Sequence, residues 1–275
     1  MDIKYVVFSS GAMGGLSLIG SWRALEERNI THNIKGLSGC SIGSVIATLV
    51  SIGYTSKELE DIATLFQYED YSDLHFRMLS DNFGIETGHK IIKLLQKIIK
   101  HKTGNKYLTF ADHWKLTGRQ LWINAGHLEE HKSKYYSVFT SPNMTITDAI
   151  RQSISIPFLF TAIKTDIGTF IDGGCYDPVP ANMFPPKYTL CFNIRNNKID
   201  NTTSPDNLLS YSTSLLGSVF NQLNNYRFEK QEKAGWRIIY IDTGLKSFTL
   251  QLDKKELIHT INLGYISTIN HIEKI

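Results

Sequence analysis

Short, continuous apolar runs alternate along this chain with longer runs whose apolar residues recur at helical spacing. The first short run, Tyr5 to Phe8, predicts a buried strand, and the next run, roughly Leu16 to Arg28, predicts a helix. Further strands are predicted over Ile34 to Ser38, Gln120 to Ala125, Tyr135 to Phe139, Tyr188 to Ile194 and Trp236 to Ile241. Further helices are predicted over Ser44 to Ile52, after Thr55, over Lys90 to Lys102, after Thr109, after Thr147, over Leu208 to Phe228 and after Asp253.

Strands that alternate with helices are typical of a layered α/β protein whose central sheet is largely parallel. We therefore predict a three-layer α/β/α fold. Two exceptions to the alternation are a hairpin predicted around Asp166 to Gly168 and an irregular, aromatic and acidic segment from Tyr68 to Phe83. No internal repeat or linker interrupts the pattern, so a single domain over residues 1–275 is expected.

Composition adds limits to this picture. The hydrophobic fraction of 42% and the charged fraction of 20% are those of a soluble globular protein, and a net charge of +3 does not indicate a nucleic-acid partner. The 3 cysteines are scattered without metal-ligand spacing, which indicates a reducing compartment and no disulfide framework. No cluster of metal ligands appears either, so we expect no metal or other cofactor. No apolar run reaches transmembrane length, and the N-terminus resembles a strand more than a signal peptide. We expect the protein to be cytoplasmic, and the alternative is a peripheral location on a membrane.

The segment from Gly39 to Gly43 carries the strongest chemical signal, a G-x-S-x-G sequence between a predicted strand and a predicted helix. This setting is the one that a nucleophile elbow requires. Glycine at Gly39 and at Gly43 lets backbones approach closely, and Ser41 is exposed at the tip beside the helix N-terminus, which favours negative charge. The alternative is an ordinary Gly-rich turn between a strand and a helix.

A second Gly-rich loop, Ser9 to Gly15, connects the first strand to the first helix. Its backbone N–H groups could bind an anion. A phosphate is one candidate, although the loop matches neither of the two common phosphate-binding sequences. The other candidate is an oxyanion formed at Ser41, and the remaining alternative is a tight turn.

Asp172 stands at the end of a predicted strand and is followed by Gly173 and Gly174. Such a sequence is often only a turn. The functional interpretation is a carboxylate held rigidly at the sheet edge, with two glycines that let another loop come close.

The predicted helix from Lys90 to Lys102 has one apolar face and one face of lysines. A basic amphipathic helix can lie on an anionic membrane surface, which would make this helix the contact for a peripheral membrane partner. Packing of the apolar face on the protein's own core is the alternative.

Taken in order, these motifs resemble the patatin-like phospholipase family. The resemblance covers about Tyr5 to Met183, with no distinctive match beyond it. Besides the three motifs, it includes the segments Trp22 to Glu27, Gly53 to Leu59, Asp148 to Ser153, Ile156 to Phe160 and Asp172 to Pro180. It implies a patatin-like hydrolase fold and a carboxylic ester hydrolase, of the phospholipase A or lipid acyl hydrolase type, that acts on phospholipids or other acyl lipids.

Carried over by position, the resemblance makes Ser41 the nucleophile and Asp172 the base, through an acyl-enzyme. It places an oxyanion hole at the backbone N–H groups of Ser10, Gly11 and Ala12. Serine is a weak nucleophile until a base takes its proton, and the pKa of an ordinary Asp is only about 3.9, so burial would have to raise it. A histidine would be an easier base, but no histidine of the chain lies in a motif.

The loop departs from the family pattern in two ways. Ser9 and Ser10 stand where consecutive glycines are usual, and Met13 stands where the family has Arg or Lys. These departures leave open a rival function, a non-catalytic lipid-binding or membrane-binding protein with a disabled oxyanion loop. A nucleotide-binding protein that uses the Ser9 to Gly15 loop for phosphate is a third hypothesis.

Overall fold

The computed structural model describes residues 2–75, 78–195, 207–245, 249 and 251–273, and it is built on one large mixed sheet. The sheet is 8-stranded, with the order β10-β9-β1-β2-β4-β8-β7, and β5 pairs with β4 beside this path. Its strands are β1 (Tyr5–Phe8), β2 (Gly36–Cys40), β4 (Gln120–His127), β5 (Lys132–Tyr136), β7 (Ile163–Thr165), β8 (Gly168–Asp172), β9 (Thr189–Arg195) and β10 (Arg237–Asp242). The pairs from β10 to β4 are parallel, whereas β5, β7 and β8 pair in antiparallel fashion.

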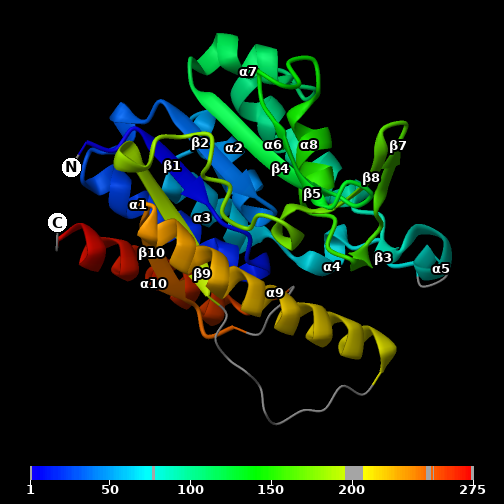
Figure 1. The fold of residues 1–275 in the computed structure, drawn as a ribbon. Helices are drawn as coiled ribbons and strands as arrows, with labels where there is room; N and C mark the ends of the chain where they lie inside the picture. Colours follow the sequence, from blue (N-terminus) through cyan, green and yellow to red (C-terminus); the bar gives the residue numbers. More distant parts are fainter. Residues whose placement is uncertain (1, 76–77, 196–206, 246–248, 250, 274–275) are drawn as a thin grey trace.

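Helices and a long loop cover the two faces of the sheet (Figure 1). The larger core lies under α1 (Ser17–Glu27), α2 (Ile42–Ser51), α8 (Ile146–Ser153) and α10 (Lys254–Ile272). On the other face, Val7 and Cys191 pack with Val179 and Phe184 from the segment after β8. Because successive strand residues point to opposite faces, Val6 and Val7 enter different cores. The predicted three-layer arrangement with a largely parallel sheet is confirmed.

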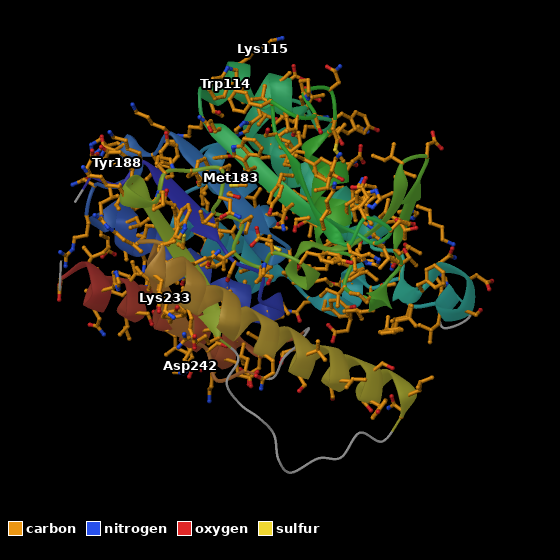
Figure 2. The ribbon with its side chains drawn as sticks, in the orientation of Figure 1. Trp114, Lys115, Met183, Tyr188, Lys233 and Asp242 are labelled. Atoms are coloured by element: carbon orange, nitrogen blue, oxygen red, sulfur yellow. The ribbon has the colours of Figure 1, made fainter. Side chains whose placement is uncertain are left out.

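The remaining elements are mostly helical. They are the one-turn helix η1 (Ala12–Leu16), α3 (Ser56–Leu65), α4 (Tyr68–Tyr71), α5 (Met78–Asn82), α6 (His89–Thr103), α7 (Phe110–Thr117) and α9 (Leu208–Lys233). The capping boxes predicted at Thr55 and at Asp253 are both present. Figure 2 shows α7, marked by Trp114 and Lys115, on the opposite side of the molecule from α9, which ends at Lys233.

Three sequence-based predictions need correction. The α8 helix is capped by Thr145, whose side chain accepts the Asp148 N–H, and not by Thr147, which lies inside the helix. The strand predicted from Tyr135 begins earlier, at Lys132, because it pairs with β4 as a hairpin. The segment predicted to be irregular contains α4 and α5, and it is followed by β3 (Gly84–Glu86), which pairs with β6 (Phe158–Phe160).

The α6 helix, predicted from Lys90 to Lys102, packs on the protein itself. Leu95 and Ile99 are buried in the main core, while Lys93 and Lys97 are exposed. Of the two predicted alternatives, the structure therefore supports packing of the apolar face on the protein's own core. The exposed lysines of α6 leave only an electrostatic contact with an anionic surface.

Candidate active site

Strand register brings Ser41 and Asp172 together. Along β4, Cys40 of β2 pairs with Asn124, and Asp172 of β8 pairs with the next residue, Ala125. The hairpin strand β5 occupies the opposite edge of β4 over the same residues, so β2 and β8 share one edge. Since β2 is parallel and β8 antiparallel to β4, their carboxyl ends meet head to head. Ser41, the candidate nucleophile, directly follows the last residue of β2. Asp172, the candidate carboxylate, is itself the last residue of β8, so both residues lie where the two strands meet.

Ser41 has the backbone of a strained turn. Its φ of 52° and ψ of −125° lie outside the regions that residues other than glycine normally occupy. The prediction that Ser41 is exposed at the tip of the turn is wrong, because this residue is buried with only 4% exposed. A Cβ at Gly39 would lie 2.2 Å from the Gly43 carbonyl oxygen, and one at Gly43 would lie 2.4 Å from the Phe8 carbonyl oxygen. Both glycines are therefore needed for close approach, as the sequence predicts.

Two hydroxyl groups hold this turn. The Ser41 N–H donates to Oγ of Ser153 at 2.8 Å, and Oγ of Ser44 donates to the Ser41 carbonyl at 2.6 Å. Ser153 is fully buried at the end of α8. The strained backbone of Ser41 is thus fixed from both its amide and its carbonyl.

Asp172 is held as firmly as Ser41. Its Oδ1 accepts the Gly174 N–H at 2.7 Å, and its own N–H donates to the Ser155 carbonyl at 2.8 Å. Burial raises the pKa of the Asp172 carboxyl to about 6, against smaller lowering effects of the Ser41 hydroxyl and the Gly174 N–H. A carboxyl with this pKa is a better proton acceptor than an ordinary aspartate, and it is still mostly ionised at neutral pH.

The second carboxylate oxygen of Asp172, Oδ2, differs from Oδ1 in its hydrogen bonding. Oδ2 is buried and accepts no hydrogen bond of normal geometry from the described part of the chain. The Ser41 hydroxyl nevertheless acts on the carboxylate as a donor. The two observations agree when the hydroxyl lies close to the carboxylate without the alignment of a full hydrogen bond, as is common in sites without substrate.

The two glycines after Asp172 sit against neighbouring loops. A Cβ at Gly173 would lie 2.6 Å from the Asn124 carbonyl oxygen, and one at Gly174 would lie 2.9 Å from Oγ of Ser10. The Asn124 side chain donates to the Asp177 carbonyl at 2.9 Å and fixes the same turn. The Asp-Gly-Gly turn therefore packs directly on the loop from Ser9 to Gly15.

That loop offers only part of the predicted set of donors. The Ser10 N–H already donates to the Pro178 carbonyl at 3.0 Å, so Ser10 has no free backbone donor. Among the described residues, none accepts a hydrogen bond from the N–H of Gly11 or Ala12. Ala12 has a φ of 47°, in the left-handed region, at the start of η1. The oxyanion hypothesis is thereby narrowed from three residues to Gly11 and Ala12.

Ser9, which departs from the family pattern, is part of the scaffold. It is fully buried, its Oγ donates to the Ser10 carbonyl at 2.9 Å, and it accepts the Ile194 N–H at 3.0 Å. The Ser9 N–H donates to the Phe192 carbonyl at 3.1 Å. The hydroxyl thus ties the loop to β9, which gives this serine a structural task that glycine could not perform.

Two buried histidines, His113 and His127, are engaged elsewhere. Nε2 of His113 lies 2.7 Å from Oγ of Ser51, and Nε2 of His127 lies 2.7 Å from the Ile167 carbonyl oxygen. Throughout the described ranges, no hydrogen bond joins a histidine to Ser41 or Asp172. The described residues therefore include no histidine that is hydrogen-bonded to either candidate.

Sequence reasoning did not identify Ser153 or Ser155 as part of the site. The available signal was weak, since both lie near the end of the predicted helix, before Pro157, and could equally be its last turn. Only the packing of α8 against β4 and β8 places them beside the two candidate reacting residues.

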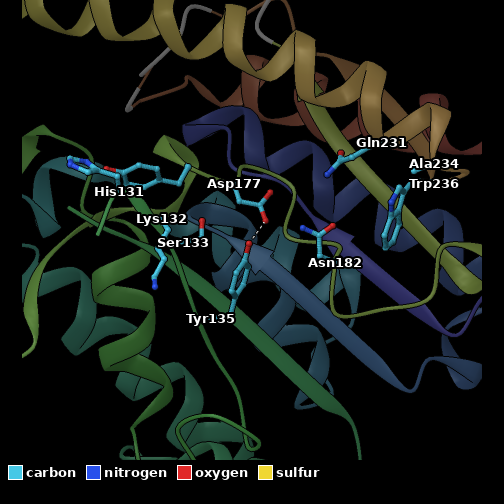
Figure 3. Close-up of a pocket in the computed structure, with 10 residues that line it drawn as sticks. His131, Lys132, Ser133, Tyr135, Asp177, Asn182, Gln231, Ala234 and Trp236 are labelled. Atoms are coloured by element: carbon cyan, nitrogen blue, oxygen red, sulfur yellow. Dashed lines mark hydrogen bonds between the residues drawn. The ribbon is translucent and has the colours of Figure 1, made fainter. Parts of the chain in front are cut away.

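A cavity of about 520 Å³ lies on the other face of β4 (Figure 3). Tyr135 donates to a carboxylate oxygen of Asp177 at 2.7 Å in this cavity, and Gln231 and Trp236 also line it. It contains neither Ser41 nor Asp172, so the position of the candidate site rests on strand register and not on the cavity.

The described residues contain no group of three or more His, Cys, Asp or Glu side chains arranged to hold a metal ion. None of the helices they form has both the length and the apolar character needed to cross a membrane.

Three proteins of known sequence are similar to this chain. An uncharacterised protein of Acanthamoeba polyphaga mimivirus is 28% identical over 98% of this chain and 96% of its own length. A probable lipid hydrolase of Invertebrate iridescent virus 6 is 29% identical over 66% of this chain and 62% of its own. An uncharacterised Bacillus subtilis protein is 30% identical over 65% of each.

Solved structures share the fold. VipD of Legionella pneumophila superposes with a TM-score of 0.64 at 18% identity, covering 100% of this chain and 67% of VipD. The type III effector protein ExoU superposes with a TM-score of 0.61 at 13% identity, covering 100% of this chain and 53% of ExoU. The family model for patatin-like phospholipases matches residues 6–185, which include both Ser41 and Asp172. The chain therefore belongs to the patatin-like phospholipase family.

Proposed function

We propose that this protein is a serine lipid acyl hydrolase that cleaves fatty acyl ester bonds of phospholipids or other acyl lipids. The observation that carries the proposal is the meeting of the carboxyl ends of β2 and β8 on one edge of β4, which places Ser41 against Asp172. Membership of the patatin-like phospholipase family and the relative named as a probable lipid hydrolase support the substrate class.

In the proposed reaction, Oγ of Ser41 attacks the carbonyl carbon of the ester and its proton passes to the Asp172 carboxylate. The proton then moves to the departing alcohol, and an acyl-enzyme remains on Ser41. A water molecule gives its proton to Asp172 and attacks the acyl carbon, which releases the fatty acid and restores the Ser41 hydroxyl. The raised pKa of Asp172 suits these transfers because the carboxylate binds a proton more readily than an ordinary aspartate.

The negative oxygen of each tetrahedral intermediate requires fixed donors. The N–H groups of Gly11 and Ala12 are the candidates, since they have no other partner among the described residues and their loop packs against the Asp-Gly-Gly turn. Each such donor stabilises a transition state by about 3–4 kcal/mol. Ser10 contributes through its position and not as a donor, because its N–H is bound to Pro178.

We further propose that residues 1–275 form a single catalytic domain in the cytoplasm or at a membrane surface. Support comes from β9 and β10, which both lie beyond the matched residues and yet extend the same sheet through β1. The activity needs no metal in this proposal, since the dyad moves every proton.

The decisive experiment measures hydrolysis of a short p-nitrophenyl ester and of phosphatidylcholine vesicles by wild type, Ser41→Ala and Asp172→Asn. Asp177→Asn serves as the matched control, because this carboxylate follows in the same loop but is held by Tyr135. We expect activity to fall at least about 1,000-fold in the first two variants and to persist in the third. Thermal melts establish that each variant is folded.

The rival function is a non-catalytic lipid-binding protein on the same fold. A serine-directed fluorophosphonate probe separates the two, since it should label wild type and not Ser41→Ala. A folded wild-type protein that binds vesicles, resists the probe and releases no fatty acid would sink the hydrolase proposal and leave the binding function.

A further inference from the structure

The first half of α9 presents large apolar side chains to solvent. Leu208, Tyr211, Leu215 and Val219 are 74%, 55%, 52% and 46% exposed. At 3.6 residues per turn these four positions fall within about 80° of arc, so they form one stripe along the helix. Gly217, on the opposite side, is buried. We call the four exposed residues the α9 stripe.

This arrangement is the reverse of an ordinary surface helix, whose apolar stripe faces the core. Scattered exposed apolar residues need no explanation, but a continuous row of them on one helix face does. Leaving such a row in water gains nothing for folding. Because none of the described residues covers these four side chains, we look for a partner outside the described part of the chain.

Charge identifies the partner. No Asp, Glu, Lys or Arg occurs from Asn207 to Tyr226, and the non-apolar positions there are Ser, Thr, Asn, Gln and Gly. A helix that binds an anionic membrane carries a cluster of Lys or Arg, and this half of α9 has none, since its charged residues begin at Arg227. An uncharged half-helix with an apolar stripe and small polar residues matches a surface that offers apolar gaps and no net charge, which is a bilayer of neutral lipids with loose packing.

The position of the stripe agrees with that partner. In Figure 1, β1, β2 and β4 run toward the side of the molecule from which the first half of α9 projects. The candidate nucleophile lies at the carboxyl end of β2, and α9 contacts β6, which follows α8. A bilayer that binds the stripe would lie on the side where the ends of these strands hold the proposed site.

We propose that the α9 stripe is the surface by which this protein docks on loosely packed, electrically neutral lipid bilayers. The link between docking and turnover rests on the proposed hydrolase function, whereas docking itself does not. Contact depends on apolar insertion, so it should be stronger on highly curved vesicles and insensitive to salt.

The test uses the full chain in a Ser41→Ala background, so that the lipid stays intact. Binding to phosphatidylcholine vesicles of about 30 nm and about 400 nm is measured by flotation, at about 0.05 M and about 0.5 M salt. The stripe variant is Leu208→Ser with Leu215→Ser, and both positions are exposed enough to tolerate it. The matched control is Leu65→Ser with Leu116→Ser, since those leucines are 80% and 57% exposed on α3 and α7.

We expect the stripe variant to bind small vesicles at least about tenfold more weakly than the control, with little effect of salt. Equal binding by the two variants would overturn the proposal. So would wild-type binding that requires anionic lipid and is lost in Lys93→Glu with Lys97→Glu, because α6 would then be the contact. A dimer that forms without lipid and dissociates in the stripe variant would assign the stripe to a second copy, also against the proposal.

Activity distinguishes this proposal from the hydrolase proposal. In the active chain, the stripe variant should lose vesicle hydrolysis and keep hydrolysis of the short soluble ester. Vesicle binding by wild type without release of fatty acid would refute the hydrolase and leave the docking surface standing. Hydrolysis of the soluble ester without vesicle binding would refute the docking surface and leave the hydrolase standing. Loss of soluble-ester hydrolysis in the stripe variant would mean that α9 is part of the catalytic structure, which would also overturn the docking role.

Discussion

Oγ of Ser153 accepts a hydrogen bond from the N–H of Ser41 at 2.8 Å, across 112 residues of sequence. Two residues later, the Ser155 carbonyl accepts the N–H of Asp172 at 2.8 Å. The end of α8 therefore holds both candidate reacting residues by their backbones. A single short segment sets the distance between the candidate nucleophile and the candidate base, and this relationship can be tested without changing either residue.

We predict that Ser153→Ala lowers kcat for the soluble ester about 10-fold or more, with a smaller change in KM, because Ser41 loses the group that fixes its amide. The stability loss should be about 1–3 kcal/mol, as for other buried donors left unpaired. Ser21→Ala is the control, since its buried hydroxyl bonds to the Ser17 and Gly264 carbonyls. If both variants lose stability alike and neither loses rate, Ser153 is merely structural.

The pH dependence of the rate should report Asp172. Burial raises the pKa of this carboxyl to about 6, and only the ionised form accepts the Ser41 proton. The value of kcat/KM should therefore rise with pH, reach half its maximum near pH 6 and level off above about pH 7.5. A profile already flat at about pH 4.5 would mean that Asp172 has an ordinary pKa or is not the base.

The same raised pKa predicts that Asp172 costs stability at neutral pH. Between its unfolded value of about 3.9 and its folded value of about 6, the folded state binds more protons, so stability falls as pH rises through this window. Integration gives about 3 kcal/mol, fully lost above the folded pKa. Asp172→Asn should therefore melt at a higher temperature than wild type at pH 8, and the gap should close near pH 4. A gap that does not depend on pH would contradict this account.

The sequence predicted the main elements of the site because local signals marked them. The G-x-S-x-G turn lies between β2 and α2 as expected, and the hairpin before Asp172 is present. What could not be predicted was how β2 and β8 meet. The register along β4 depends on the pairing of Cys40 with Asn124 and of Ala125 with Asp172, which lie 84 and 47 positions apart in the chain. That register, and not either motif, places Ser41 against Asp172.

Two other features of the site depend on contacts that local patterns do not contain. The Ser10 N–H looked like a free donor in a Gly-rich loop, but the Pro178 carbonyl, far along the chain, accepts it. The helix from Lys90 to Lys102 has the same amphipathic pattern whether its partner is a membrane or a core. Only the packing of Leu95 and Ile99 decides for the core.

A further prediction concerns Ser9, which stands where the family usually has glycine. Ser9→Gly would restore the glycine usual at this position, yet it removes the hydroxyl that bonds the Ser10 carbonyl and the Ile194 N–H. We expect a loss of about 1–3 kcal/mol in unfolding free energy and no gain in esterase rate. Chemical denaturation and the p-nitrophenyl ester assay check both. A stable variant with higher activity would mean that Ser9 impairs the oxyanion loop.

The elbow glycines predict a contrast between steric and conformational cost. Gly39→Ala would place a Cβ 2.2 Å from the Gly43 carbonyl oxygen and 2.6 Å from the Ser44 Cα, and both of these are backbone atoms with no room to move. Gly53→Ala would meet nothing within 4 Å, but it must hold a φ of 94°. We expect Gly53→Ala to cost about 1–2 kcal/mol and to keep full activity. Gly39→Ala should cost more than about 3 kcal/mol and abolish activity, because the clash can be relieved only by displacing Ser41 or Gly43. Urea denaturation and ester hydrolysis measure the two effects together. An active, stable Gly39→Ala protein would show that the turn tolerates a side chain, and the close approach argued here for the nucleophile elbow would be wrong.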